Sequence, residues 1–512
     1  MHAMHEIELK FQIPDSALTA VEAELKARAD HHRERLQAYY MDTPDRRLAQ
    51  ARMALRVRKE GRKWVQTLKA GGSNTMMRVE DNQPAKAVAK GQAAKADLSL
   101  HLNTPAQAPL QQALTWDAAL DPQGSKLGLT ELYRTDIWRQ TVRLAVGTGT
   151  PHAGVIEVAL DLGEIRAGGL SVPVQELEIE LIEGHPMAVI EAGRDWVDRH
   201  GLWLDTQTKA HRGDRLARRA AAPDTPQGGV SLKARPARLD TSATLDQAWR
   251  AGVESCLEQI TANLSELATA PLDTSPSLYQ LRVGLRRLRS LGSLLAGEDL
   301  PFPQEAMANA VDLFRKLGYW RDGDVLGWIP PMLTMLGGPD MPLPGGEAPA
   351  DPVSLARSPE ATHLCLDLLA ALLAPPATSG PAMQLYRPVL QAQLKRWHQH
   401  ALNLSKGFRN QTDEARHRVR KQCKRLRYAM DLYAPLLDKR PGRDTYLKQL
   451  KAVLSALGAL QDEVSAAHRY REATAHDPRA WFGLGWLQAR RGAHIEAARQ
   501  ELKIWRKTRS PW

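Results

Sequence analysis

Charged side chains alternate with apolar ones near the start of the chain, in the segment EIELK. A strand places alternate residues on one face, so this segment predicts a face formed by Glu6, Glu8 and Lys10. A later segment, QELEIEL, predicts an acidic face formed by Glu176, Glu178 and Glu180. Carboxylate oxygens in such rows are the ligands that hard divalent cations prefer.

Charges of one sign also alternate in two other segments. Arg56 and Arg58 alternate in ALRVRKE, and Glu157 and Asp161 share a face in IEVALD. For any single segment the alternative is an ordinary solvated strand face. Like charges along a strand repel, however, unless opposite charges lie between the strands. Acidic and basic rows can face each other inside a closed antiparallel barrel, and one cavity then holds acids for a metal and bases for phosphate oxygens. These are the groups that metal-assisted phosphoryl transfer requires.

The ordered set of segments resembles the CYTH family, the triphosphate tunnel metalloenzymes. The resemblance runs through EIELK, YYMDT, ALRVRKE, QTLK, IEVALDLGEI, ELEIEL and TKAHRG. It implies an eight-stranded antiparallel β-barrel with flanking helices, which binds a triphosphate together with Mg²⁺ or Mn²⁺. The family's R-x-E segment resembles MMRVEDN, where Asn82 stands in place of a second acid.

The resemblance also implies roles for individual residues. The implied metal ligands are Glu6, Glu8, Glu157, Asp161, Glu176 and Glu178. The implied catalytic residues are Lys10, Arg56, Arg58, Lys69, Glu80 and Arg139. The further substrate contacts are Arg78, Lys209 and Arg212.

Beyond about residue 240, long segments rich in Leu, Ala and Arg recur at helical spacing. YQLRVGLRRLRSL, which starts at Tyr279, aligns with HRVRKQCKRLRYA, which starts at His417. LGYWRD and LGALQD follow in the same order at nearly the same spacing. The two matches indicate an internal duplication.

Both repeated segments carry a stripe of basic residues when they are placed on a helix. Arg282, Arg286 and Arg289 lie at i, i+4 and i+7 and so share one face. A solvated basic helix face is the alternative for an isolated stripe, but two duplicated stripes favour anion binding.

The two segments resemble the CHAD family, whose members build two four-helix bundles and are associated with inorganic polyphosphate. His417 matches the family's histidine, whereas Tyr279 replaces it in the first copy. The implied polyphosphate-binding residues are Arg282, Arg286, Arg287, Arg289, His417, Arg420, Lys421, Lys424, Arg425 and Arg427.

The expected organisation is therefore a multidomain α+β protein. A tunnel domain occupies residues 1–215, a linker 216–240 and an all-α domain 241–512. The helical domain divides into a first half (241–336), a break rich in Pro and Gly (337–382) and a second half (383–512). Helices are expected at 15–29 and 186–200.

The composition favours polyanionic partners, since the formal net charge is +11. Aromatic residues make up only 5% of the chain, which disfavours a protein that stacks nucleobases. The three cysteines are far apart, and no signal peptide or membrane span is evident. We therefore expect a cytoplasmic protein that can associate with polyphosphate granules, with no membrane partner and nucleic acid disfavoured.

The leading hypothesis is an inorganic triphosphatase that cleaves tripolyphosphate to pyrophosphate and phosphate, with a polyphosphate-binding helical domain. The alternatives are a polyphosphate-binding adaptor with little catalysis, a nucleoside or thiamine triphosphatase, and a class IV-like adenylate cyclase. The sequence leaves open the preferred metal and triphosphate, and also whether polyphosphate is substrate, anchor or regulator.

Overall fold

The computed structural model describes residues 5–70, 77–88, 94–223, 231–269, 275–298, 300, 302–345, 350–437 and 441–512. The chain divides into two compact units. The first unit contains residues 1–229, 264–266 and 356–373. The second unit contains residues 230–263, 267–355 and 374–512.

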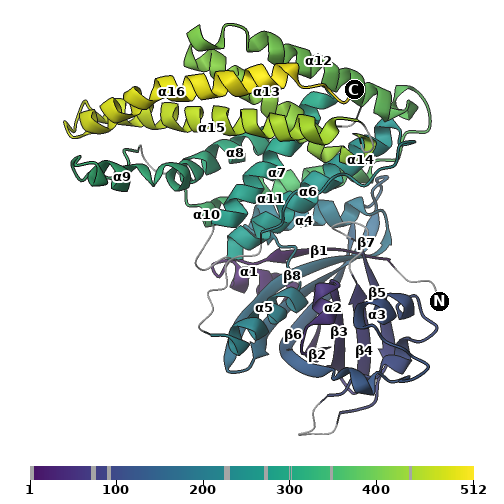
Figure 1. Cartoon of the computed structure of the whole chain (residues 1–512). Coiled ribbons are helices and arrows are strands. Elements are labelled where there is room, and N and C mark those ends of the chain that lie inside the picture. The colour runs from purple at the N-terminus through teal and green to yellow at the C-terminus, as the bar shows by residue number, and fades with distance from the viewer. Residues whose placement is uncertain are drawn as a thin grey trace. The chain divides into compact units, whose positions relative to one another are not determined.

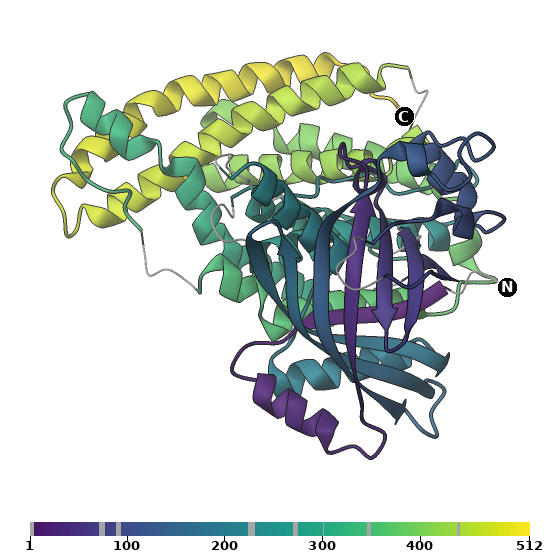
Figure 2. The ribbon, with the colours of Figure 1, turned by 90° about the horizontal axis from the view of Figure 1, so that it is seen from below.

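One antiparallel sheet, strongly curved, forms the centre of the first unit (Figures 1 and 2). Within the described residues it has nine strands: β1 (His5–Gln12), β2 (His32–Asp42), β3 (Met53–Glu60), β4 (Lys63–Ala70), β5 (Met77–Pro84), β6 (Thr130–Val146), β7 (Gly154–Ala167), β8 (Leu170–Gly184) and β9 (Trp203–Leu204). The strand order is β5-β4-β3-β2-β6-β7-β8-β1-β9. The expected antiparallel sheet is thus confirmed, and the short strand β9 adds a ninth member beside β1.

Strand β1 has a further partner at its start. Residues His5, Glu6 and Ile7 pair with Val79, Arg78 and Met77 of β5. The first and last strands of the run from β5 to β1 are therefore hydrogen-bonded neighbours.

Apolar side chains bury much of the outer face of the sheet. Helix α4 (Met187–His200) packs against β1, β7 and β8 and confirms the helix expected at 186–200. On β7 and β8 the residues that alternate with the acidic row are Ile156, Val158, Leu177 and Ile179, and all four are fully buried. The period-2 pattern therefore separates a charged inner face from an apolar outer face on these strands.

Other short elements cover the remaining strands. Helices α2 (Arg47–Gln50) and α3 (Gln107–Leu114), with the 3₁₀ turn η1 (Leu98–His101), surround buried Leu55 of β3 and Leu68 of β4. Helix α1 (Leu18–Lys26) lies within the helix expected at 15–29 and buries Val21 and Leu25.

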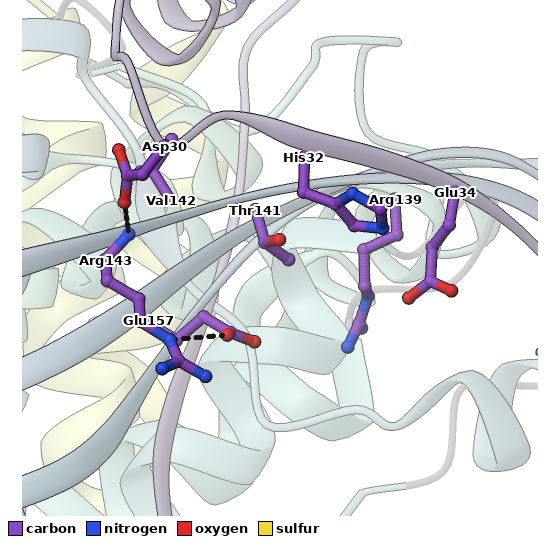
Figure 3. A pocket seen from close by; sticks show the side chains of 8 residues that line it. All are labelled: Asp30, His32, Glu34, Arg139, Thr141, Val142, Arg143 and Glu157. Atoms are coloured by element: carbon purple, nitrogen blue, oxygen red, sulfur yellow. Dashed lines mark hydrogen bonds and ion pairs between the residues drawn. The ribbon is translucent and has the colours of Figure 1, made fainter.

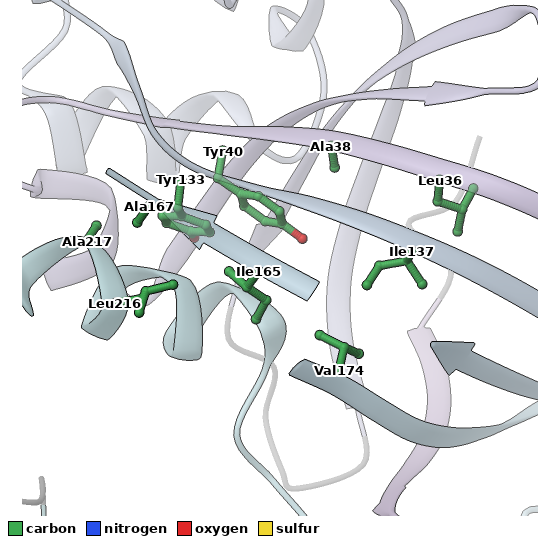
Figure 4. Close-up of a cluster of buried hydrophobic side chains, with 10 residues drawn as sticks. All are labelled: Leu36, Ala38, Tyr40, Tyr133, Ile137, Ile165, Ala167, Val174, Leu216 and Ala217. Atoms are coloured by element: carbon green, nitrogen blue, oxygen red, sulfur yellow. The ribbon is translucent and has the colours of Figure 1, made fainter. Parts of the chain in front are cut away.

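Helix α5 (Lys209–Ala221) covers part of the inner face, the face of the sheet that carries Glu176. Thr208 caps its N-terminus by accepting a hydrogen bond from the His211 N–H. The buried cluster there, shown in Figure 4, consists of Leu36, Ala38, Tyr40, Tyr133, Ile137, Ile165, Ala167, Val174, Leu216 and Ala217. This apolar end of the inner face lies beside its charged end.

The second unit is helical. Its long helices are α6 (Leu245–Thr269), α7 (Ser275–Leu294), α8 (Gln304–Leu326), α12 (Tyr386–Leu404), α13 (Asp413–Leu432), α15 (Arg443–Ala473) and α16 (Ala480–Lys507). Its short helices are α9 (Ile329–Met335), α10 (Pro352–Ala356) and α14 (Ala434–Leu437). Helices α15 and α16 run side by side as a long hairpin (Figure 1).

The two repeated segments form α7 and α13, and these helices pack against each other. Each also packs against the helix that carries the following repeated motif, α8 for the first copy and α15 for the second. The duplication seen in the sequence is therefore matched by equivalent neighbours in space.

Two segments outside the repeats are better ordered than their composition predicts. Residues 231–240 run alongside α6. The Asn263 side chain of α6 donates to the Leu232 carbonyl at 2.9 Å and accepts from the Leu232 N–H at 3.1 Å. The Pro/Gly-rich break contains helix α11 (Pro359–Leu373), which belongs to the first unit and packs against α4. No helix in the described ranges is both long enough and apolar enough to cross a bilayer.

Candidate active site and phosphate-binding surface

Acidic and basic residues from different strands share the inner face of the sheet. The register places Lys10 opposite Glu178, Arg139 opposite Asp161, and Lys69 opposite Glu80. The acidic and basic rows expected from the sequence therefore do face the same space.

The centre of this face is a buried cluster of carboxylates around Lys209 of α5. The Lys209 Nζ atom lies 2.7 Å from Asp161 Oδ2, 2.8 Å from Glu176 Oε2 and 2.7 Å from Glu178 Oε1. The side chains of Asp161 and Glu176 are almost completely buried. One ammonium group therefore neutralises part of a charge that three strand residues share.

Two arginines complete this cluster. Arg139 binds Asp161 through two contacts of 2.7 Å and reaches Glu178 Oε2 at 2.5 Å. Arg212 Nη1 lies 2.5 Å from Glu176 Oε1. A planar guanidinium can bridge two carboxylates in this way because its N–H groups form a rigid fork.

The shifted pKa values in the cluster follow from these contacts. Burial raises the pKa of Glu176, but the charges of Lys10, Lys209 and Arg212 outweigh it and lower the pKa to about 2. Burial lowers the pKa of Lys209, yet Asp161, Glu176 and Glu178 raise it well above its usual value. Glu176 and Lys209 are thus both charged across the neutral pH range.

Basic residues gather on the neighbouring strands β3 and β4. Lys69 Nζ lies 2.6 Å from Glu80 Oε2, and Arg56 Nη2 lies 3.6 Å from Glu80 Oε1. Burial lowers the pKa of the Arg58 guanidinium, and the charges of Arg56 and Arg139 lower it further. Three guanidinium groups close enough to repel each other form a site that favours a polyanion.

A polar pocket of about 380 Å³ opens over β2, β6 and β7 (Figure 3). Arg143 contributes two contacts there: its backbone N–H donates to Asp30 Oδ2 at 2.7 Å, and its Nε lies 3.6 Å from Glu157 Oε2. The residues that line the pocket are Asp30, His32, Glu34, Arg139, Thr141, Val142, Arg143 and Glu157. Among the described residues of this lining, Val142 is the one with an aliphatic side chain.

The sequence places Glu180 in the acidic row, but it was not among the residues assigned to the metal. Its register partners are Glu8 on β1 and Glu157 on β7. Burial raises the pKa of Glu180, and the charges of Glu8 and Glu157 raise it further, to about 6. The alternation of QELEIEL already places Glu180 on the face of Glu176 and Glu178, and that is the signal from which it could have been assigned.

The predicted metal ligands divide between two surroundings. Asp161, Glu176 and Glu178 are held by lysine and arginine side chains, whereas Glu8 and Glu157 lie with Glu180. The side chains of Glu6 and Arg78 lie outside the described residues, although the strand backbone pairs the two positions. Among the residues the structure describes, no three His, Cys, Asp or Glu side chains form a ready metal-binding group. The oxygen donors nevertheless suit a hard divalent cation.

The two repeats of the helical unit bring their basic stripes together at α7 and α13. Burial lowers the pKa of Lys424 to about 6, and the nearby charges of Arg286, Arg420 and Arg282 contribute to this shift, which Asp462 opposes. Lys424 belongs to the second copy and both Arg282 and Arg286 to the first. The duplicated stripes therefore act on each other electrostatically.

An aromatic ring supports the first stripe. The guanidinium carbons of Arg282, Arg286 and Arg289 lie 4.2, 5.0 and 5.3 Å from the centre of the Phe314 ring of α8. The Arg282 Nη1 atom also donates to the Phe314 carbonyl at 2.7 Å. The ring stabilises three adjacent cations through its π face, a contact that the sequence alone did not reveal.

The two copies share further details. A Cβ atom at Gly318 of LGYWRD would lie 3.3 Å from Arg282 Nη1, and one at Gly458 of LGALQD would lie 3.9 Å from Arg420 Nη2. The histidine position differs, since His417 Nδ1 lies 2.5 Å from Gln461 Oε1. Its counterpart Tyr279 stacks with the guanidinium of Arg321 at 5.4 Å.

One residue assigned to this surface does not lie on it. Arg287 is almost completely buried and bonds to Gln259 Oε1 at 2.7 Å and to Ser255 Oγ at 2.8 Å. It is the helix position next to Arg286, about 100° around the axis, and therefore faces α6. Arg287 stabilises helix packing rather than a surface for phosphate.

The remaining assigned residues flank the stripe. Lys421 and Arg425 are exposed. Burial lowers the pKa of Arg289, and the charge of Arg425 lowers it further. Arg427 pairs with Asp431 at 2.7 Å.

Comparison with known proteins identifies both parts. Residues 4–213 match the CYTH domain, and residues 251–471 match the CHAD domain. The chain therefore contains an N-terminal CYTH domain and a C-terminal CHAD domain.

An inorganic triphosphatase from Haemophilus influenzae is 27% identical over 177 residues, which are 34% of this chain and 44% of that protein. The chain thus spans less than half the length of this curated relative. A crystal structure of a CHAD domain from the plant Ricinus communis is 25% identical, covers 56% of this chain and 99% of its own, and has a TM-score of 0.44. A putative adenylyl cyclase from Hippeastrum, described as having a dominant triphosphatase activity, is 19% identical, covers 41% of this chain and 95% of its own, and has a TM-score of 0.27.

Proposed function

We propose that the protein is a metal-dependent inorganic triphosphatase that hydrolyses tripolyphosphate to pyrophosphate and phosphate. The observation that carries this proposal is the inner face of the sheet. It concentrates buried carboxylates and several guanidinium and ammonium groups within hydrogen-bonding distance of each other. Such a face can receive a metal and a phosphate chain together.

We propose that the first 215 residues form the tunnel domain and that the strands from β5 to β1 enclose it. The pairing of β1 with β5 supports enclosure because it joins the two ends of the eight-strand run. Residues 216–240 would then link it to a helical domain of two pseudo-repeated bundles at 241–512. The packing of α7 on α13 supports that arrangement.

The metal would be Mg²⁺ or Mn²⁺, and the acidic row would hold it. Its ligands would come from Glu6, Glu8, Glu157, Asp161, Glu176 and Glu178, together with Glu180. The charges of Glu8 and Glu157 help to raise the pKa of Glu180, and a bound cation would offset this repulsion. When bound, such an ion neutralises phosphate oxygens and makes a water molecule more acidic.

The basic residues would bind and orient the phosphate chain. Arg139, Lys209 and Arg212 each pair with carboxylates of the site. An incoming triphosphate offers the same kind of oxygen acceptor, so these cations can exchange one anionic partner for another. Further phosphate contacts would come from Lys10, Arg56, Arg58, Lys69 and Arg78. Glu80 would position Lys69 and Arg56 through its ion pairs with them. Charges fixed in place before the substrate binds cost little reorganisation during the reaction.

The pocket of Figure 3 favours an inorganic substrate over a nucleotide. Its lining is mostly charged, and none of the described residues that line it is a Phe, Tyr or Trp that could stack a base. A phosphate chain alone can satisfy such a lining. This argues against a nucleoside triphosphatase or an adenylate cyclase as the main activity.

We further propose that the surface formed by α7 and α13 binds inorganic polyphosphate and can bring the protein to polyphosphate granules. The members that support this surface are Arg282, Arg286, Arg289, His417, Arg420, Lys421, Lys424, Arg425 and Arg427. A second candidate function follows from the same surface, a polyphosphate-binding adaptor with little turnover.

A phosphate-release panel separates these functions. Purified full-length protein is assayed with tripolyphosphate, long-chain polyphosphate, ATP and thiamine triphosphate, each with Mg²⁺ and with Mn²⁺. We expect tripolyphosphate to be cleaved with the highest kcat/KM. Strong polyphosphate binding without release from any substrate would favour the adaptor, and preferential cleavage of ATP would contradict the inorganic substrate.

Neighbouring arginines of α7 test the polyphosphate surface. Arg286→Ala should weaken the binding of long-chain polyphosphate by the full-length protein and reduce the salt dependence of binding, because one fewer counterion is released. Arg287→Ala should instead lower the free energy of unfolding and leave the affinity of the folded protein unchanged. Equal losses of affinity in both variants would contradict this surface.

A further inference from the structure

The loop between β9 and α5 carries a buried carboxylate, Asp205, that belongs to neither acidic row. Only 1% of its surface is exposed. It comes about 195 residues after Lys10 of β1, yet its backbone N–H donates to the Lys10 carbonyl at 2.9 Å. The loop is therefore fixed to the strand that begins the site.

Both carboxylate oxygens of Asp205 have partners. The Oδ1 atom accepts from the Gln207 N–H at 2.8 Å. The Oδ2 atom accepts from Gln12 Nε2 at 2.8 Å and lies 3.4 Å from Lys10 Nζ. The carboxylate thus stands between its own loop and two side chains of β1.

Lys10 is held from several sides. Besides Asp205, its Nζ donates to the Gln207 carbonyl and lies 3.4 Å from Glu176 Oε1. The Gln12 amide bridges the same two carboxylates, since Nε2 also lies 3.2 Å from Glu176 Oε1. Glu176 is part of the site, whereas Asp205 holds Lys10 from the loop side.

We propose that Asp205 is a positioning residue that, with the Gln207 carbonyl, fixes the Lys10 ammonium for contact with the phosphate chain. This inference rests on the proposed triphosphatase function for its catalytic consequence, but not for the positioning itself. A fixed anion behind a flexible lysine reduces the number of rotamers that the side chain must give up when substrate binds. Lys10 could then exchange its contact with Glu176 for a phosphate oxygen while Asp205 continues to hold its ammonium group.

The first test measures Lys10 without relying on activity. Native full-length protein is treated with a reductive methylation reagent, and the modification of each lysine is followed by mass spectrometry. Asp205→Asn should raise the labelling rate of Lys10 several-fold, whereas Lys69, which pairs with Glu80, should be unaffected. An unchanged rate at Lys10 would overturn the positioning role.

The second test is a double-mutant cycle on tripolyphosphate hydrolysis. Asp205→Asn should lower kcat/KM by about tenfold or more, and most of this loss should disappear when Lys10 is already replaced in Lys10→Met. A purely structural role would cost the same in both backgrounds. If the wild type shows no turnover, the proposed function fails, while the labelling result still decides the role of Asp205.

Two further variants guard against misfolding. Asp205→Ser keeps a hydroxyl acceptor for the Gln207 N–H and should reproduce the effects of Asp205→Asn. Asp42→Asn removes another buried carboxylate, which accepts hydrogen bonds from the backbone of α2 and has no hydrogen bond to Lys10. It should leave Lys10 labelling and the KM unchanged. If both Asp205 variants were insoluble while Asp42→Asn folded, Asp205 would be a folding residue and the proposal would be wrong.

Discussion

Arg139 of β6 and Asp161 of β7 are register partners and form a two-point ion pair. The Nε–Oδ1 and Nη2–Oδ2 distances are both 2.7 Å. The same guanidinium also reaches Glu178 on the next strand, so one side chain ties three strands together. It also lines the pocket of Figure 3.

The first prediction concerns the shape of this cation. Arg139→Lys keeps the charge but replaces a rigid fork by a single point donor, which cannot bridge Asp161 and Glu178 in the same geometry. We expect kcat for tripolyphosphate to fall by about a hundredfold, as displacements of about 1 Å in a site can do. Steady-state phosphate release measures this. Arg143→Lys, an exposed residue of the same pocket, is the matched control, and equal losses in the two variants would contradict the assigned role of Arg139.

The second prediction concerns the stability that Lys209 provides. Lys209→Met leaves Asp161, Glu176 and Glu178 without their common cation, so we expect the free energy of unfolding at pH 7 to fall by about 3–5 kcal/mol. Urea denaturation of metal-free protein measures the change. A loss below about 1 kcal/mol, the range of a surface ion pair, would show that the cluster is not coupled as described.

The same variant has a distinct pH dependence. Glu176 has a lowered pKa of about 2 in the folded protein, against a usual value of 4.5. A lowered carboxylate pKa contributes stability that is present above about pH 4.5 and is lost as the pH falls towards 2. Removal of Lys209 raises that pKa, so Lys209→Met should lose less stability than the wild type over this range.

Much of the candidate site could be predicted from alternation alone. Period-2 spacing correctly placed Glu8, Glu176 and Glu178 on one face, because neighbouring strand residues must point to opposite sides. It could not show that Lys209 and Arg139 neutralise this row, since those contacts join residues more than twenty positions apart. The contact of Asp205 with Lys10 could not be predicted for the same reason.

The helical surface shows a second limit of the sequence. Arg286 and Arg287 are adjacent and chemically identical, and only the packing of α7 against α6 decides which of them is buried. The Phe314 ring under the first stripe comes from a different helix and has no signal in the stripe itself.

The third prediction concerns proton uptake by Lys424. Burial and the charges of Arg286, Arg420 and Arg282 lower its pKa to about 6, against a usual value of 10.5, while Asp462 opposes the shift. The free protein therefore carries a neutral amine at pH 7.5, and a bound polyanion favours the protonated form. Affinity for polyphosphate should rise as the pH falls from about 8 towards 6, with a proton taken up on binding.

Calorimetry in two buffers of different ionisation enthalpy counts that proton. Lys424→Met should remove the uptake, whereas Lys421→Met, an exposed neighbour, should retain it. Proton uptake that is identical in the wild type and both variants would assign the coupling to another group.

The fourth prediction compares two equivalent glycines. Gly318→Ala places a Cβ 3.3 Å from Arg282 Nη1, so the guanidinium must shift, whereas Gly458→Ala places one at an ordinary 3.9 Å from Arg420 Nη2. Both replacements remove a glycine from a helix, which favours folding by about 0.5–1 kcal/mol. Gly458→Ala should gain this stability with unchanged polyphosphate affinity, and Gly318→Ala should bind more weakly.

Thermal unfolding and polyphosphate titration of the two variants test this contrast. Gly485→Ala in α16, where a Cβ meets no atom within 4 Å, controls for the helix effect alone. Equal affinities for the two repeat variants would show that the position of Arg282 does not matter for binding.

The central claim is that the acidic row binds a divalent cation that hydrolysis of a triphosphate requires. The direct measurement is the rate of phosphate release from tripolyphosphate as a function of Mg²⁺ concentration, for the wild type and for Glu8→Gln combined with Glu180→Gln. A matched control is Glu131→Gln with Glu164→Gln, which removes two glutamates that pair with exposed arginines.

We predict that a chelator stops the wild type, that the Glu8/Glu180 variant loses about a hundredfold or more in rate at any Mg²⁺ concentration, and that the control is unaffected. Phosphate release that persists in the chelator, or a Glu8/Glu180 variant as fast as the control, would contradict the account.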